Sequence, residues 1–143
     1  MSLQGERDLG TLLASLDPIL DPETFIFLTT KEPMHNLPLQ SLQPQMLFQE
    51  SESLTIIVSS RNLDGALDFA RQATFKCRMI SLRVHSSLEA VGLIAAIAAK
   101  LKERGISSNV VSGFFHDHLF VPLGREDDTM QALRDLAREA GSS

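Results

Sequence analysis

The chain has 143 residues, of which 43% are hydrophobic and 22% charged, so one compact domain or two very small domains sharing a core are expected. The net charge of −5 and the lack of any run of Lys or Arg argue against a nucleic-acid partner. The polar start predicts no secretory signal, and the most apolar stretch, residues 88–101, is shorter than the roughly 20 residues of a membrane span. We therefore expect a cytoplasmic protein without a membrane partner.

Short apolar segments separated by proline make up the first half of the chain. The expected elements, in chain order, are a helix over residues 9–16, a strand over 24–30, a hairpin of strands over 46–49 and 54–59, and a helix over 63–70. Pro33, Pro38 and Pro44 predict that no regular helix forms between residues 31 and 45. The single cysteine, Cys77, cannot form an internal disulfide and is expected to be a small structural residue near the start of a strand.

The second half begins with an alternating strand over residues 78–85, in which Ile80, Leu82 and Val84 point the same way. Ser86 and Glu89 then form a capping box, which satisfies two backbone donors at a helix start. The helix is expected to continue through residue 102 or 103 and to stop at Gly105. Its predicted apolar stripe consists of Leu88, Val91, Ile94, Ala95, Ala98 and Leu101.

Two strands and a helix complete the chain. The strands are expected over residues 107–114 and 119–123, with a tight polar corner at residues 116–118 between them. The last helix carries three acidic residues in its first turn, where they suit the helix dipole. Its predicted buried face consists of Met130, Leu133, Leu136 and Ala140.

The order of these elements predicts a repeat. The second half reads strand–helix–strand–strand–helix, which is the split βαβ arrangement without its final strand. The first half has a related order in which a proline loop replaces a helix. We expect an α+β fold of ferredoxin-like βαββαβ units, with an antiparallel sheet and helices on one face. The two units of this degenerate tandem repeat are expected over residues 1–75 and 76–143, and the alternative is one domain with an N-terminal extension.

Two sequence stretches carry a family resemblance. They are His85-Ser-Ser-Leu-Glu-Ala-Val-Gly-Leu93 and Gly105-Ile-Ser-Ser-Asn-Val-Val-Ser-Gly-Phe-Phe-His-Asp-His-Leu-Phe-Val121. The chain resembles small stand-alone members of the ACT-domain family that carry two ACT-like repeats, specifically over about residues 80–123. Ser112 and Phe115 depart from that pattern, where a small residue and often a tyrosine are expected. The resemblance implies a βαββαβ regulatory sensor of amino acids or similar metabolites, with the ligand at an interface between two units.

The resemblance also implies a set of ligand-binding residues. They are His85, Ser86, Ser87, Leu88, Val91 and Gly92 around the turn, with Asn109, Val110 and Val111 opposite. A helix N-terminus presents free N–H groups that could hold a carboxylate, and an Asn amide can donate and accept at once. The structural alternative is that Ser86 only caps the helix, Gly92 only eases packing and Asn109 only satisfies a strand edge.

The segment His116-Asp117-His118 suggests a different site. Two imidazoles two residues apart on a strand face the same way, and His85 could supply a third metal ligand. In an antiparallel corner, however, Asp117 more often stabilises the turn. No nucleophile–base pair, Gly-x-Ser-x-Gly elbow or phosphate-binding glycine loop is evident from the sequence.

These observations favour a non-enzymatic protein that binds a small molecule, most simply an amino acid, as a homodimer without a cofactor. A protein–protein interaction module is the second hypothesis. A metal-binding protein or metal-dependent enzyme through His85, His116 and His118 is the third.

Overall fold

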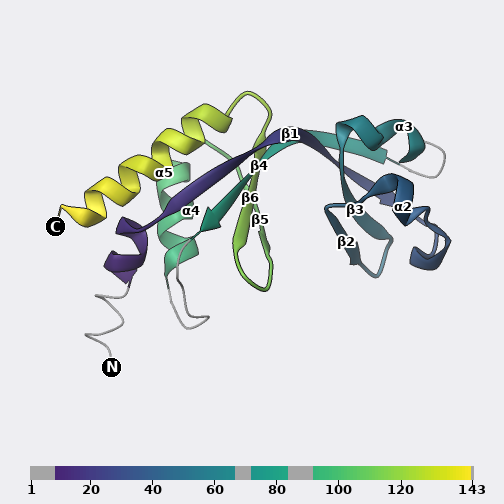
Figure 1. Ribbon diagram of the computed structural model, residues 1–143, viewed down its shortest axis with the longest axis horizontal. Helices are drawn as coiled ribbons and strands as arrows, with labels where there is room; N and C mark the ends of the chain where they lie inside the picture. The colour runs from purple at the N-terminus through teal and green to yellow at the C-terminus, as the bar shows by residue number, and fades with distance from the viewer. Residues whose placement is uncertain (1–8, 67–71, 84–91, 143) are drawn as a thin grey trace. The chain divides into compact units, whose positions relative to one another are not determined.

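The computed structural model describes residues 9–66, 72–83 and 92–142 (Figure 1). The chain forms two compact units: unit 1 combines Met1–Asp21 with Met79–Ser143, and unit 2 is Pro22–Arg78. The strands, in hydrogen-bonded order, are β2 (Met46–Gln49), β3 (Leu54–Ser59), β1 (Asp17–Thr30), β4 (Gln72–Arg83), β6 (Asp117–Pro122) and β5 (Asn109–Ser112). Strands β1 and β4 each contribute one part to both units.

Unit 2 is a complete ferredoxin-like unit. Its elements are the second part of β1, α2 (Leu39–Leu42), β2, β3, α3 (Leu63–Ala66) and the first part of β4, with short 3-10 turns at Met34–Asn36 and Ser60–Asn62. Strand β3 pairs antiparallel with both β1 and β2. Alternation along the strands places one set of side chains in a core, and these are Ile26, Leu28, Leu37, Leu42, Leu54, Ile56 and Val58.

Unit 1 has the same order with an unexpected origin for one strand. It contains the second part of β4, α4 (Leu93–Glu103), β5, β6 and α5 (Glu126–Gly141). The fourth strand, which the second half of the sequence lacks, is supplied by residues 17–21 of β1, since β1 neighbours β4 in the sheet. A short N-terminal helix over residues 9–14 also belongs to unit 1.

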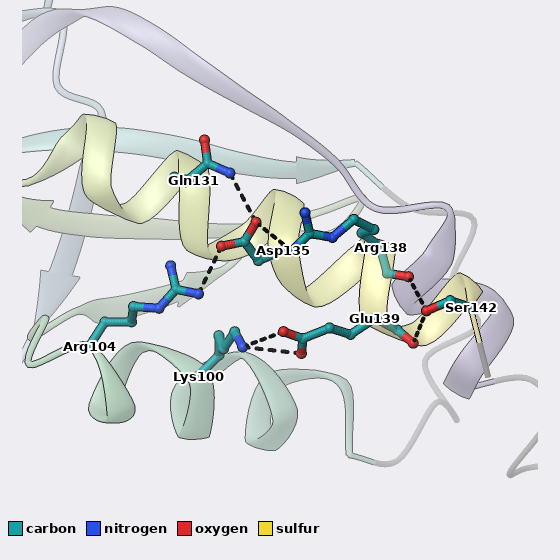
Figure 2. A network of polar contacts seen from close by, with 7 residues as sticks. All are labelled: Lys100, Arg104, Gln131, Asp135, Arg138, Glu139 and Ser142. Atoms are coloured by element: carbon teal, nitrogen blue, oxygen red, sulfur yellow. Dashed lines mark hydrogen bonds and ion pairs between the residues drawn. The ribbon is translucent and has the colours of Figure 1, made fainter.

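The core of unit 1 lies between its sheet and its helices. Ile80, Leu82, Leu119 and Val121 of the strands pack with apolar residues of α4 and α5, so these two helices share one face of the sheet. Alternation then directs Ser81, His118 and Phe120 to the face that α4 and α5 leave uncovered, here called the open face of unit 1, where Ser81 and His118 are partly exposed and Phe120 is buried. The two helices are also joined by ion pairs from α4 to α5 (Figure 2).

Most of the sequence-derived elements are found in the described residues. The hairpin strands have the predicted bounds, and Met130 and Leu133 are buried on α5. Gly105 ends α4 with a positive φ of 68°, and the Ile106 N–H donates to Leu101 O at 2.9 Å. The helix predicted over residues 63–70 is described only as far as Ala66. No helix of the described residues is long and apolar enough to cross a membrane.

Two expectations about helices were wrong. One α-helical turn, α2, does form between Pro38 and Pro44, with Pro38 at its N-cap, where a missing N–H costs no helical hydrogen bond. Helix α4 begins at Leu93, because Gly92 at its N-cap has a left-handed φ of 96° that a helix interior does not accept. The predicted helix start at Ser86 lies outside the described residues. The second wrong expectation is the apolar stripe of the helix. The buried residues of α4 are accordingly Leu93, Ile97, Lys100 and Leu101, whereas Ala95 and Ala98 are exposed.

The predicted boundary at residue 75 separates two sequence repeats, whereas the compact units of the structure combine segments from both ends of the chain. It stays a prediction.

Candidate functional site

The predicted ligand-binding residues divide into a described and an undescribed group. His85, Ser86, Ser87, Leu88 and Val91 lie outside the described residues, together with the predicted capping box. Gly92, Asn109, Val110 and Val111 are described, so the geometry of the candidate site is built from the start of α4 and from β5.

Gly92 lies at the start of α4 and is partly exposed. A Cβ at this position would lie 3.3 Å from Leu9 Cδ2 of the N-terminal helix, so the glycine permits close packing as well as a positive φ. The first turn of α4 contains no acidic residue, whereas that of α5 contains Glu126, Asp127 and Asp128. The partial positive charge at the start of α4 is therefore not compensated by its own first turn and favours a nearby anion.

Strand β5 lies at one end of the hydrogen-bonded strand order. Asn109 pairs with Phe120 and Val111 with His118, so Asn109 and Val111 share the open face of unit 1. Val110 pairs with Leu119, which belongs to the helix-covered core, so Val110 points to the other face and is 40% exposed. The structure thus separates Val110 from the other two β5 residues of the predicted set.

The open face also carries a serine that the sequence pattern did not single out. Ser81 Oγ and His118 Nδ1 are 2.8 Å apart, and they come from the neighbouring strands β4 and β6. Burial and the nearby His116 ring lower the pKa of His118 below its ordinary value, and Asp117 partly opposes them. His118 is therefore held neutral near pH 7, with one ring nitrogen in a hydrogen bond to Ser81.

A serine beside an imidazole raises the question of a nucleophile and its base. The second ring nitrogen, His118 Nε2, lies toward Gly113, since a Cβ there would be 3.4 Å away. In a catalytic dyad that nitrogen usually meets a carboxylate that orients the ring. The contact is better explained as a hydrogen bond that fixes His118 on the open face. The sequence pattern does not indicate this contact, because the two residues lie 37 positions apart.

The corner between β5 and β6 differs from the prediction. The Gly113 N–H donates to His116 O at 2.8 Å, so the turn is made by residues 113–116, and Asp117 and His118 belong to β6. His116 Nδ1 is buried without a hydrogen-bond partner. Among the described residues, no three His, Cys, Asp or Glu side chains are grouped to hold a metal, and His85 lies outside that part of the chain.

Cys77 has the structural role that the sequence predicted. It is buried, and its Sγ lies 3.5 Å from Phe25 O. Burial raises the pKa of the Cys77 thiol to about 12. A thiol with this pKa is protonated at neutral pH and is a poor nucleophile.

Comparison with protein families gives two consecutive matches. Residues 4–78 match one model of the ACT domain and residues 74–135 match a second. No curated protein matches the chain significantly.

Three solved structures show the extent of the similarity. A protein of unknown function from Vibrio cholerae, described as a possible transport protein, is 37% identical, with a TM-score of 0.81 over 93% of this chain and 98% of that one. A protein from Agrobacterium tumefaciens is 15% identical, with a TM-score of 0.69 over 85% and 89%. The ligand-free regulatory subunit of aspartate kinase from Thermus thermophilus is 12% identical, with a TM-score of 0.62 over 84% and 97%. The last two show a shared fold only.

Proposed function

The chain belongs to the ACT-domain family, and from this membership we propose that it is a regulatory protein that binds an amino acid or a similar small carboxylate. The tandem of ACT domains carries the proposal, because the same fold forms the regulatory subunit of an aspartate kinase. A regulatory, ligand-binding role follows from the family. The amino acid, the homodimer and the lack of catalysis are the finer parts of the proposal.

The described residues support a carboxylate ligand. The start of α4 offers backbone N–H groups without an acidic residue in its first turn. Asn109 on the exposed part of β5 could donate to a carboxylate and accept from an ammonium group. The proposed site also includes residues outside the described part, and its full set is His85, Ser86, Ser87, Leu88, Val91, Gly92, Asn109, Val110 and Val111.

The chemistry of the described polar groups supports a role without catalysis. Cys77 is protonated and buried. His118 contacts Ser81 through one ring nitrogen, and its other ring nitrogen faces Gly113, where a catalytic base would need an orienting carboxylate. The ligand is therefore proposed to act by shifting the assembly or the partner contacts of the protein. A cytoplasmic location stays a prediction from the sequence.

Thermal unfolding in the presence of each common amino acid tests the proposal. A ligand at 100 times its Kd stabilises the folded state by about 2.7 kcal/mol, which gives a clear rise in Tm. The variant N109A should weaken the binding of that ligand at least tenfold. The matched control is Q49A, which removes an exposed amide from the other end strand, β2, and should leave the affinity unchanged.

The proposal fails if no amino acid or related carboxylate raises Tm. If N109A and Q49A change the ligand affinity equally, β5 is not part of the ligand site. A stoichiometric protein that co-purifies with a ligand-insensitive chain would favour the interaction module.

A further inference from the structure

The N-terminal helix of unit 1, residues 9–14, is anchored at its C-terminal end. Leu13 and the following Leu16 are each 8% exposed and belong to the core cluster of the unit. The first residue, Leu9, is only partly buried and packs against that cluster. The helix is therefore fixed to the core at one end, whereas its first residue depends on a contact nearer the surface.

The two ends of this helix contact α4 and α5. A Cβ at Gly92, the N-cap of α4, would lie 3.3 Å from Leu9 Cδ2. A Cβ at Gly141, the last residue of α5, would lie 3.7 Å from Ala14 Cβ. Figure 1 shows the N-terminal helix beside the C-terminal end of α5. A glycine at each contact thus lets the short helix approach the start of α4 and the end of α5 together.

The contact with Leu9 lies where α4 begins. Glycine accepts positive and negative φ with nearly equal ease, so its surroundings decide the left-handed φ of 96° at Gly92. The Gly92 carbonyl accepts a hydrogen bond from the Ala96 N–H at 2.8 Å, which ties it to the first turn of α4. The Leu9 methyl fills the space that a side chain would take at Gly92 and limits the motion of that residue. Packing of the N-terminal helix therefore holds the first turn of α4 in place.

We propose that Leu9 is a positioning residue for the proposed ligand site, and that the packed N-terminal helix tightens ligand binding at the start of α4. The inference rests on the proposed function and adds a residue that the predicted set does not contain. Ordering a loose segment on binding lowers the affinity, because its conformational entropy is lost at that step. A first turn that Leu9 already holds does not carry this cost.

The coupling between the ligand and the N-terminal helix is reciprocal. If the packed helix increases the ligand affinity by some factor, the bound ligand increases the packing equilibrium of the helix by the same factor. A bound amino acid should therefore slow amide exchange over residues 9–16, although its carboxylate lies at the start of α4.

Amide exchange followed by NMR tests the positioning of α4 without a ligand. L9A should speed the exchange of the Ala96 amide at least tenfold, because the Gly92 carbonyl is its acceptor. The Ile106 amide donates to Leu101 O at the other end of α4 and should keep its rate. An Ala96 amide that exchanges equally fast in L9A and in the wild type overturns the proposal.

Two further variants separate this effect from a general loss of stability. Leu136 is also partly buried and packs against the same core, so L136A is the matched control and should leave the Ala96 exchange rate unchanged. L9M keeps an apolar side chain of similar volume and should return the rate to within twofold of the wild type. An effect of L136A as large as that of L9A would overturn the specific role of Leu9.

Titration calorimetry with the common amino acids, one at a time, measures the effect on binding. An amino acid that binds the wild type should bind L9A at least fivefold more weakly. Its affinity for L9M and for L136A should lie within twofold of the wild-type value.

A disulfide tests the sign of the coupling. The separation of 3.7 Å at Ala14 and Gly141 is within the range of Cβ atoms joined by a disulfide. Oxidised A14C/G141C should therefore lock the N-terminal helix on α5, and the buried Cys77 leaves this reaction clear. The oxidised form should bind the same amino acid at least as tightly as the reduced form. Weaker binding by the oxidised form would mean that the helix must move away for a ligand to bind, which overturns the proposal.

The positioning role and the proposed function fail separately. If an amino acid binds L9A and the wild type equally, the role of Leu9 is refuted and the proposed function stands. If L9A speeds the exchange of the Ala96 amide and no amino acid binds any variant, the proposed function is refuted and the contact of Leu9 remains a structural one.

Discussion

Lys100 on α4 allows a sharp test of how the two helices of unit 1 are held together (Figure 2). Its side chain is only 8% exposed, and its ammonium group lies 2.9 and 3.1 Å from the two carboxylate oxygens of Glu139 on α5. The Glu139 side chain is 53% exposed. The lysine has therefore lost most of its contact with water, whereas its partner has kept about half.

This asymmetry predicts different costs for removing either partner. E139Q leaves a buried ammonium with a neutral partner. Breaking a fully buried pair costs about 3–5 kcal/mol, and the exposure of Glu139 reduces the expected loss to about 1–2 kcal/mol. K100M removes the buried charge, keeps the apolar contacts of the stem and returns Glu139 to water. It should change the free energy of unfolding by less than about 0.5 kcal/mol.

Urea unfolding followed by circular dichroism at 222 nm measures both variants. For a chain of this size, this loss should lower the Tm of E139Q by roughly 2–8 °C. The control is D128N, which breaks an exposed ion pair with Arg125 and should cost less than about 1 kcal/mol. A larger loss for K100M than for E139Q, or no loss for E139Q, would refute the reasoning.

Further predictions concern four separate residues. L133A removes a fully buried side chain of α5 and should lower the free energy of unfolding by about 2–5 kcal/mol in urea. G92A forces a side chain into a φ of 96° and should cost about 1–2 kcal/mol in the same assay. The lowered pKa of His118 means that the folded state disfavours the charged ring, so stability should fall as pH drops below about 6.5 toward the folded-state pKa. Cys77, with its pKa raised to about 12, should resist iodoacetamide at pH 8 and react once urea unfolds the chain.

Each of these predictions has its own control. L136A, at a half-buried position of the same helix, should cost less than L133A, and an equal cost would contradict the described core. Gly10 has no atom within 4 Å of an added Cβ, so G10A should be tolerated better than G92A. H118N should reduce the loss of stability between pH 7.5 and 5.5. If the dependence of stability on pH is unchanged in H118N, the loss comes from another titratable group. Rapid alkylation of the folded protein would contradict the burial of Cys77.

Local patterns in the sequence were sufficient for several elements. Alternation along residues 46–59 predicted the hairpin with the observed bounds, and the spacing of Met130 and Leu133 predicted the buried face of α5. The predicted apolar stripe of α4 was confirmed at Ile94 and Leu101 and wrong at Ala95 and Ala98, because the apolar residues of this segment allow more than one helical face. The backbone conformation of Gly92, and not side-chain hydropathy, sets the residue at which α4 begins.

The candidate site was predictable only in part. Asn109 and Val111 do share the open face, but Val110 follows the alternation of β5 onto the other face. Ser81 could have been paired with His118 only from the order of β4 and β6, which are joined by a helix and a further strand. The sequence contains Phe114 and Phe115 but does not indicate that their side chains are exposed, which only the structure shows.

The sequence by itself determined the two hairpin strands and the end of α4 at Gly105, because each depends on residues that are close together in the chain. Only the tertiary structure decided that residues 17–21 complete unit 1, because strand neighbours form between backbone groups that look alike in any sequence. It also decided that Lys100 is buried against Glu139, since a helix surface becomes an interior only when a second helix packs on it.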